Sequence, residues 1–109
     1  MHVIGVRRSL VEAHPWLGAS LMKAFEESKA RCLPELTQMA ALKISLPWIA
    51  QEAADTKALM GDDFWPYGID ANRKTLDAFL RYHHGQGLSA RPMKLEELFL
   101  ASTMERAKV

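Results

Sequence analysis

The sequence has few of the features that mark several large classes of protein. It has one cysteine in 109 residues, which excludes an intramolecular disulfide. Fourteen basic and thirteen acidic side chains leave a formal net charge of +1, so no overall field attracts the chain to phosphate backbones or anionic lipid. No apolar run approaches the roughly 18 residues of a membrane span, and no signal-peptide pattern is present. We therefore expect a soluble, cytoplasmic chain that binds neither nucleic acid nor membrane.

Metal ligands and phosphate-binding motifs are also scarce. One Cys and four scattered His do not supply the paired ligands of a tetrahedral zinc site. His83 and His84 are adjacent on an expected helix and point roughly 100° apart, so we expect them to have structural or solvent roles. Neither a Gly-rich phosphate loop nor a Gly-x-Ser-x-Gly elbow is present, so nucleotide binding and serine hydrolysis lack support. We expect no metal site.

The composition that remains is that of a folded globular chain. Hydrophobic residues make up 49% of it and charged residues 25%, a balance that supports a single domain at this length. Residues 2–7 are short and rich in β-branched side chains, which predicts one buried N-terminal strand. Because such a strand needs neighbours on both sides, we expect it to belong to a larger sheet. Ser9 and Glu12 match a capping box, which predicts a short helix from Leu10.

Most of the chain beyond this point has helical spacing. Pro15 can begin a helix that continues to about Arg31, because proline is tolerated at the first helical position. Cys32 falls on the apolar face of this helix, so we expect an inert buried thiol. The residues expected on that buried face are Leu17, Leu21, Ala24, Phe25, Ser28 and Cys32.

Further helical segments follow Pro34. A weak one is expected at 35–42, and a stronger one runs from about 46 to Gly61 with Ser45 as a possible cap. Asp70 can cap the next helix, which ends near Gly85 or Gly87 and has Leu76, Phe79, Leu80 and His83 on one face. Short helical pieces are expected at 95–100 and 103–108, the last with a Ser102 to Glu105 capping-box spacing. One strand and four to six helices give a mainly α fold.

An aromatic turn, Trp65-Pro66-Tyr67, enters the helix that carries Arg73. Such a wall could hold a planar anionic ring, with the guanidinium meeting a carboxylate in bidentate fashion. The alternative makes Arg73 a surface charge of the first helical turn and the aromatics a lid on helix packing. His2 would lie at the rim of the apolar strand, where an imidazole can donate a proton, and the alternative there is an ordinary hydrogen-bonded histidine.

Two stretches, HVIGVRRSLVEAHPWL at 2–17 and DDFWPYGIDANRKTL at 62–76, resemble the 4,5-dihydroxyphthalate decarboxylase family, and FLRYH at 79–83 and QGL at 86–88 continue the match. The resemblance implies a two-lobed α/β protein of the type II periplasmic-binding-protein fold, with a ligand cleft between its lobes. Residues 1–109 would form a single helical segment in its C-terminal third.

The resemblance also implies a reaction, the removal of one carboxylate from 4,5-dihydroxyphthalate to leave protocatechuate. The hydroxyl para to the leaving carboxylate can push electrons onto the carbon that an acid protonates. The reaction needs that general acid, clamps for two carboxylates and a dry aromatic slot. No organic cofactor is required, and a metal chelated by the catechol is an alternative. The candidates are His2 as catalytic proton donor and, for substrate binding, Arg7, Trp65, Tyr67 and Arg73.

Three functions remain open on this basis. In the first, the chain is part of a decarboxylase and has little or no turnover alone. In the second, the same fold captures a small organic acid or a vitamin precursor as a solute-binding protein. In the third, the chain is a helical module without catalytic activity that forms a homo-oligomer through its unpaired N-terminal strand.

Overall fold

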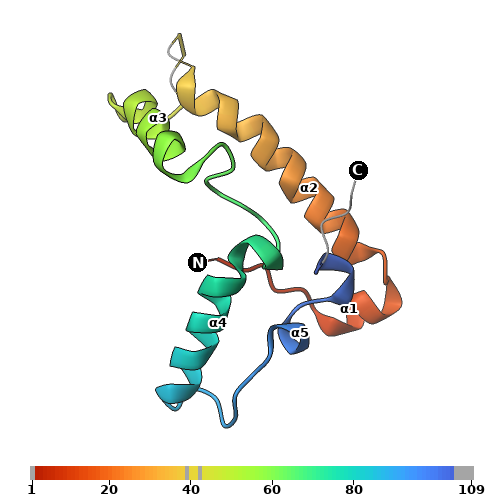
Figure 1. Ribbon diagram of the computed structural model, residues 1–109. Helices are drawn as coiled ribbons and strands as arrows, with labels where there is room; N and C mark the ends of the chain where they lie inside the picture. Colours follow the sequence, from red (N-terminus) through yellow and green to blue (C-terminus); the bar gives the residue numbers. More distant parts are fainter. Residues whose placement is uncertain (1, 39, 42, 105–109) are drawn as a thin grey trace. The chain divides into compact units, whose positions relative to one another are not determined.

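The computed structural model describes residues 2–38, 40–41 and 43–104, and all the regular structure within them is helical (Figure 1). This confirms the mainly α prediction. The chain divides into two compact units, of which the first comprises Met1–Lys23 with Tyr67–Val109 and the second Ala24–Pro66. The elements in chain order are α1 (Arg8–Ala13), α2 (Leu17–Cys32), the 3₁₀ turn η1 (Leu33–Thr37), α3 (Ile49–Met60), α4 (Ile69–Gly85), α5 (Leu95–Leu98) and the 3₁₀ turn η2 (Ala101–Thr103).

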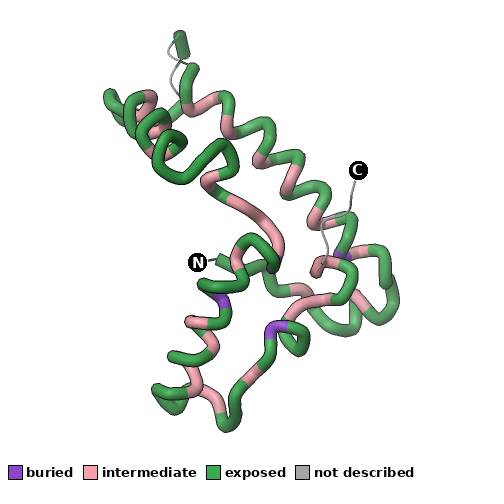
Figure 2. Tube along the Cα trace, viewed as in Figure 1, coloured by how far each residue is buried: buried purple, intermediate pink, exposed green. Residues whose placement is uncertain are grey.

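The core of the first unit is small and is built on α4. Ile69 and Leu76 of α4 and Leu95 of α5 are buried, with 4%, 7% and 2% of each residue exposed. Intervals of seven and four residues place Ile69, Leu76 and Leu80 on one side of the helix. Figure 2 shows how few positions along the chain reach this degree of burial. The partly buried residues Leu80, Phe99 and Met104 pack against the three.

Glycines shape both ends of α4. Gly68 precedes the helix with φ at 93°, a value that favours glycine, and its carbonyl accepts a 2.8 Å hydrogen bond from Asn72 Nδ2. Asp70 therefore lies inside the first turn, and the prediction that it caps the helix was wrong. At the other end, Gly87 has φ at 74°, and the Leu88 N–H donates to the His83 carbonyl at 3.0 Å. This pattern is a Schellman-type stop, which confirms the predicted end of the helix.

The beginning of α1 differs from the capping box expected at Ser9 and Glu12. The helix starts at Arg8, and Arg7 occupies the N-cap position without a side-chain hydrogen bond to the helix. Ser9 is therefore already helical and is placed too late in the chain to cap. By contrast, α2 was predicted within two residues at each end.

The buried face of α2 is rotated from the one its apolar residues suggested. Phe25 is 39% exposed and Cys32 is exposed, so the prediction of a buried thiol was wrong. Lys29 is half-buried, and its Nζ donates to Asp63 Oδ1 at 2.9 Å and to the Trp65 carbonyl at 3.1 Å. These two polar bonds fix which side of the helix faces the loop at 62–66. The half-buried residues on this face of α2 are Leu17, Leu21, Met22, Glu26 and Lys29.

In the second unit, η1 packs against α3. Trp48 is the N-cap residue of α3 and makes no side-chain cap bond, so Ser45 does not cap it. Gly61, with φ at 87°, ends the helix as predicted, and its N–H donates to the Lys57 carbonyl at 2.8 Å. Among the described residues of this unit, none is a buried hydrophobic. Its exposed large hydrophobics are Phe25, Ile44, Leu46, Trp48, Leu59, Met60 and Trp65.

The strand expected at residues 2–7 is not confirmed. The described part of this segment has no regular structure, and Val3 and Ile4 are 64% and 66% exposed. A strand exists only when a neighbour accepts and donates its backbone hydrogen bonds, and none of the described residues forms a strand. The helical piece expected at 103–108 lies mostly outside the described residues, as does Glu105 of its capping-box spacing.

Candidate functional site

The five residues predicted for the site fall in both units. His2, Arg7, Tyr67 and Arg73 belong to the first unit and Trp65 to the second. His2 and Arg7 are exposed, and so is Ile4, one of the residues expected to form the apolar rim beside His2. Each of these residues is therefore described by its own surroundings.

Arg73 is engaged by carboxylates of its own unit. Its Nη1 donates to Glu96 Oε1 at 3.3 Å, and its Nη2 lies 4.0 Å from Asp70 Oδ1. The pKa of Glu96 is lowered, chiefly by a hydrogen bond from its own backbone N–H and next by the bond from Arg73. Because 47% of the Arg73 side chain is exposed, a ligand carboxylate can reach it only in competition with these two partners.

The aromatic turn is held by its backbone as much as by its rings. The carbonyl of Trp65 accepts the bond from Lys29, while 57% of Trp65 stays exposed. Tyr67 is half-buried and precedes the left-handed Gly68. The main chain at Trp65 is thus anchored within the second unit, and the Trp65 ring presents one of the larger apolar surfaces of that unit.

The first unit has an open hollow on the flank of α4, with a volume of about 290 Å³. Asp77, Arg81 and His84 recur at intervals of four and three residues, which places all three on one side of the helix. A hollow of this size is at the lower limit of small-molecule sites. Its lining residues are Asp77, Leu80, Arg81, His84, Pro92 and Met93.

Among the residues that line this hollow, His84 is the one best suited to acid–base chemistry. Its Nδ1 lies 3.2 Å from the Ser89 carbonyl, and because a carbonyl only accepts, Nδ1 must carry the proton. In the neutral ring this leaves Nε2 as a hydrogen-bond acceptor or base. The neighbouring His83 instead lies against Phe79, with ring centroids 5.7 Å apart. The sequence predicted structural or solvent roles for both histidines and did not distinguish the ring beside Phe79 from the one in the hollow.

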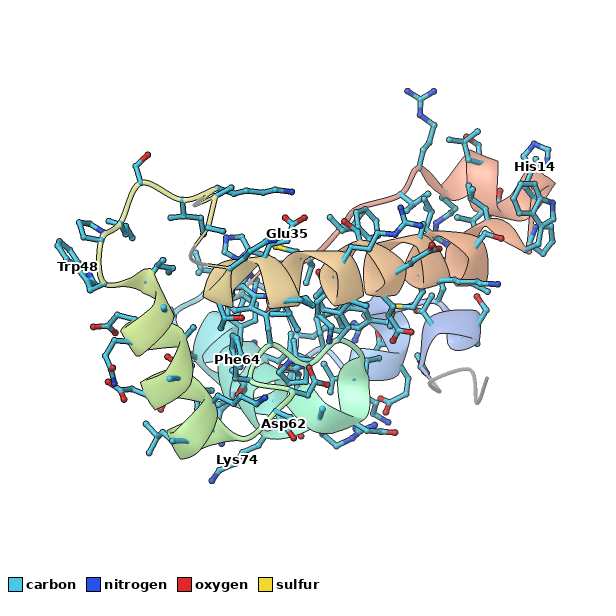
Figure 3. The ribbon with its side chains drawn as sticks, turned by 90° about the horizontal axis from the view of Figure 1, so that it is seen from above. His14, Glu35, Trp48, Asp62, Phe64 and Lys74 are labelled. Atoms are coloured by element: carbon cyan, nitrogen blue, oxygen red, sulfur yellow. The ribbon has the colours of Figure 1, made fainter. Side chains whose placement is uncertain are left out.

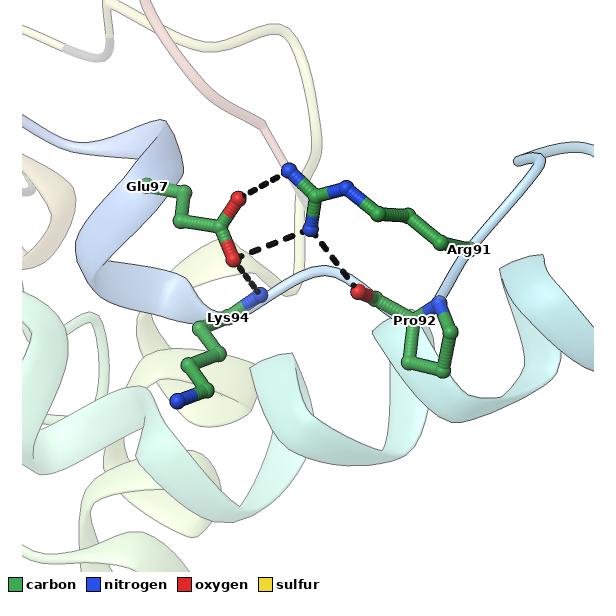
Figure 4. A network of polar contacts seen from close by, with 4 residues as sticks. All are labelled: Arg91, Pro92, Lys94 and Glu97. Carbon is green, nitrogen blue, oxygen red and sulfur yellow. Dashed lines mark hydrogen bonds and ion pairs between the residues drawn. The ribbon is translucent and has the colours of Figure 1, made fainter.

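A polar network holds the wall of the hollow formed by Pro92 and Met93 (Figure 4). Arg91 binds the Glu97 carboxylate through both terminal nitrogens, with Nη1 to Oε1 at 3.1 Å, and also donates to the Pro92 carbonyl at 3.1 Å. The Lys94 backbone N–H donates to Glu97 Oε1 at 3.2 Å. Both bonds lower the pKa of Glu97, that from Arg91 the more, and the pair raises the pKa of Arg91. The linker before α5 is thereby tied to the start of that helix.

Within residues 2–38, 40–41 and 43–104, no three His, Cys, Asp or Glu side chains come close enough together to hold a metal ion. In this same part of the chain, no helix combines the length and the apolar character that crossing a bilayer requires.

The described residues form a helical polypeptide with an open, charged hollow on the flank of α4 and much uncovered apolar surface. Over all of its 109 residues the chain is 44% identical to the 4,5-dihydroxyphthalate decarboxylase of Comamonas testosteroni. It spans 33% of the length of that relative. The resemblance carried by residues 2–17 and 62–76 is therefore confirmed. No protein-family profile matches the chain, and no solved structure matches it either.

Proposed function

We propose that this chain is the C-terminal part of a decarboxylase that acts on 4,5-dihydroxyphthalate or a closely similar aromatic dicarboxylate. The observation that carries the proposal is the 44% identity to such an enzyme, which extends over the whole chain. Because the chain spans only a third of that relative, we propose that it has no turnover by itself.

The wider fold belongs to the same proposal. We place the chain in a two-lobed α/β protein of the periplasmic-binding-protein type, where residues 2–7 would form a strand between strands supplied by the rest of the protein. Support comes from the β-branched, exposed side chains of Val3 and Ile4, which are costly to leave in water. Such residues favour a pleated, covered surface.

The proposed chemistry requires one general acid and cations for two carboxylates. His2 is the first candidate acid, with Arg7 and Arg73 as carboxylate partners and Trp65 and Tyr67 as walls for the ring. The hollow on α4 supplies a second pair, because Arg81 can clamp a carboxylate and His84, once protonated, can deliver a proton from Nε2. Neither pair needs an organic cofactor.

The activity is tested on two proteins. One is this chain, and the other is a chimera in which the chain replaces the matching third of the Comamonas testosteroni enzyme. Both are incubated with 4,5-dihydroxyphthalate, and protocatechuate is followed by chromatography beside the intact relative. We expect product from the chimera and none from the chain. A chimera that folds but forms no protocatechuate would refute the proposed reaction.

Variants of the chimera separate the two candidate acids. Loss of a general acid typically slows a reaction by about 10²- to 10⁴-fold. His2→Gln and His84→Gln are compared for kcat, with His14→Gln as the matched control, since His14 is exposed and its ring lies tilted against that of Trp16. We expect a loss of this size in one of the first two variants only. Near-equal kcat values in all three would remove histidine from the mechanism.

Self-association is a second candidate function of this chain, favoured by the exposure of Val3 and Ile4. An uncovered strand-forming segment is a template for pairing with another copy. We propose a homo-oligomer through residues 2–7, which light scattering would detect as a mass above 12.3 kDa. Ile4→Lys should restore the monomer, and a wild-type chain that is monomeric at high concentration would contradict the pairing.

A further inference from the structure

One face of α3 combines large apolar residues with acidic ones and has no cover within its unit. Trp48, Glu52, Asp55 and Leu59 follow one another at intervals of four, three and four residues, so they share one side of the helix. We call these four residues the outer face of α3. Trp48 is 59% exposed and Leu59 86%, the highest exposure among the large hydrophobics of the described chain.

A different side of α3 is the one that packs. Ile49, Ala53 and Thr56 are half-buried, and the helix contacts η1. In Figure 3 the Trp48 ring lies at the outer end of α3 and points away from the helix. The helix therefore has two apolar surfaces. One packs within the unit, and the outer face is the second, which remains uncovered.

The second unit cannot stabilise itself by burial. It has no buried hydrophobic residue within its described part, and bodies of about 40 residues rarely fold alone without cross-links or metals. Two separate compact bodies of the sizes of these units would expose about 7,300 Å² in total. The chain exposes 8920 Å². The excess, on the order of 1,600 Å² over the whole chain, has the scale of one side of an obligate interface.

The length of the relative indicates what covers this surface. The chain accounts for 33% of the Comamonas testosteroni enzyme, so two thirds of that protein are available to lie against it. We infer that the outer face of α3 docks against the polypeptide that forms the other two thirds of the decarboxylase. The inference rests on the proposed membership of the chain in such a protein.

The charges on the outer face define the surface that receives it. Glu52 and Asp55 lie between Trp48 and Leu59 along this face, and Asp55 Oδ1 also accepts a 2.8 Å hydrogen bond from Gln51 Nε2. A matching surface has apolar sockets for Trp48 and Leu59 and basic side chains between them. This is helix-in-groove recognition, with anchors on one side of the helix.

Chemical labelling of a cysteine introduced at position 59 tests the docking directly. Leu59→Cys is made in a Cys32→Ser background, both in this chain and in the chimera with the Comamonas testosteroni enzyme. Maleimide modification is then followed by mass spectrometry of the peptide containing α3. We expect labelling in the chimera to be at least about tenfold slower than in the chain, because the docked thiol reacts only after local opening.

Ala54→Cys is the matched control, since position 54 lies on another side of α3 and is also exposed. Its labelling rate should agree in the two proteins within about twofold, because only the outer face is covered. Equal rates at position 59 in chain and chimera would overturn the docking, as would a chimera that cannot be recovered folded. Slow labelling of the chain that becomes fast on dilution would overturn it too, by making a second copy the occupant.

The decarboxylase assay on the same chimera keeps the two proposals separate. Protection at position 59 without formation of protocatechuate refutes the proposed reaction and supports the docking. Formation of protocatechuate with position 59 unprotected refutes the docking and supports the reaction.

Discussion

Lys29 is a charged side chain that α2 holds largely out of water, with 12% of it exposed. Its ammonium group meets the Asp63 carboxylate and the Trp65 carbonyl, so one cation binds two points of the loop that leads to α4. Hydrogen bonds to charged groups contribute about 1.5–3 kcal/mol, and the value falls when one partner is in solvent. Asp63, at 41% exposed, is such a partner.

Replacing Lys29 with Met keeps the aliphatic stem and removes the charge. We expect Lys29→Met to lower the free energy of unfolding by about 1 kcal/mol, because the loop loses both contacts. Urea unfolding followed by circular dichroism measures the change. The exposed Lys23, on the same helix, provides the control, since Lys23→Met should stay within about 0.5 kcal/mol of wild type. Equal effects of the two substitutions would contradict a special role for Lys29.

The contacts of Glu97 predict how the stability of the fold depends on pH. Its folded pKa is lowered from the ordinary value of 4.5, first by the bond from Arg91 and then by that from the Lys94 backbone. A lowered pKa means that the stabilising contribution is present above the ordinary value and is lost as pH falls through the folded pKa. We therefore expect the urea midpoint to fall below pH 4.5 less steeply in Glu97→Gln than in wild type.

Arg91→Gln is the companion variant for this titration. It removes the larger cause of the lowered pKa of Glu97. Below pH 4.5 the urea midpoint of this variant should therefore fall less steeply than that of wild type. Adding Glu97→Gln to Arg91→Gln should then change the profile little. If the urea midpoint falls as steeply below pH 4.5 in both single variants as in wild type, other carboxylates determine the acid sensitivity of the fold.

At the scale of the elements, the sequence predicted where the helices begin and end better than which side of each helix is buried. The positions of α2, α3 and α4 follow from Pro15, Gly61 and Gly87, since proline and left-handed glycine act on the backbone locally. The side of α2 that is buried depends instead on Asp63, a partner more than thirty residues away in sequence. No local pattern contains that information.

The same difference holds for the candidate site. The spacing of Asp77, Arg81 and His84 was visible in the sequence and could have indicated a shared side of α4. The hollow itself requires Pro92 and Met93 as its wall, and their place depends on the bond between Arg91 and Glu97. Side chains on one helix can be grouped from sequence, whereas a wall formed by a later linker cannot.

Close packing at Gly18 offers a test of the contact between α2 and the C-terminal turn. A Cβ at Gly18 would lie 2.8 Å from Leu100 Cδ1 and 3.1 Å from Ser102 Oγ, whereas one at Gly85, the last residue of α4, would meet nothing within 4 Å. Alanine is favoured over glycine in helices by about 0.8–1 kcal/mol, less at the ends. We expect Gly85→Ala to raise the free energy of unfolding by about 0.5 kcal/mol.

Gly18→Ala should instead lower the free energy of unfolding by about 1 kcal/mol, because Leu100 must move to admit the methyl group. Both variants are measured by urea unfolding. A gain in stability at both positions would mean that the C-terminal turn does not pack on α2.

At the scale of the whole molecule, the two units differ in what holds them. The first has Ile69, Leu76 and Leu95 in its core, and the second has no buried hydrophobic among its described residues. Local opening free energies follow the burial and contact density of each region. We therefore expect amides of α3 to exchange with deuterium at least about tenfold faster than those of α4 around Leu76.

Hydrogen exchange with mass spectrometry measures this difference in the isolated chain and in the chimera. In the chimera, α3 should approach the protection of α4, because its outer face is then covered. Equal protection of α3 and α4 in the isolated chain would show that the second unit is stable without a partner.

The exposed Cys32 has a practical bearing on every measurement of mass. Two chains that meet at this position can be joined covalently by air oxidation, since an accessible thiolate reacts where a buried thiol does not. Such a cross-linked pair would scatter light like one assembled through residues 2–7. A reducing buffer separates the dimer linked through Cys32 and leaves the one paired through residues 2–7 intact. The redox state of the solution therefore decides which kind of dimer is detected.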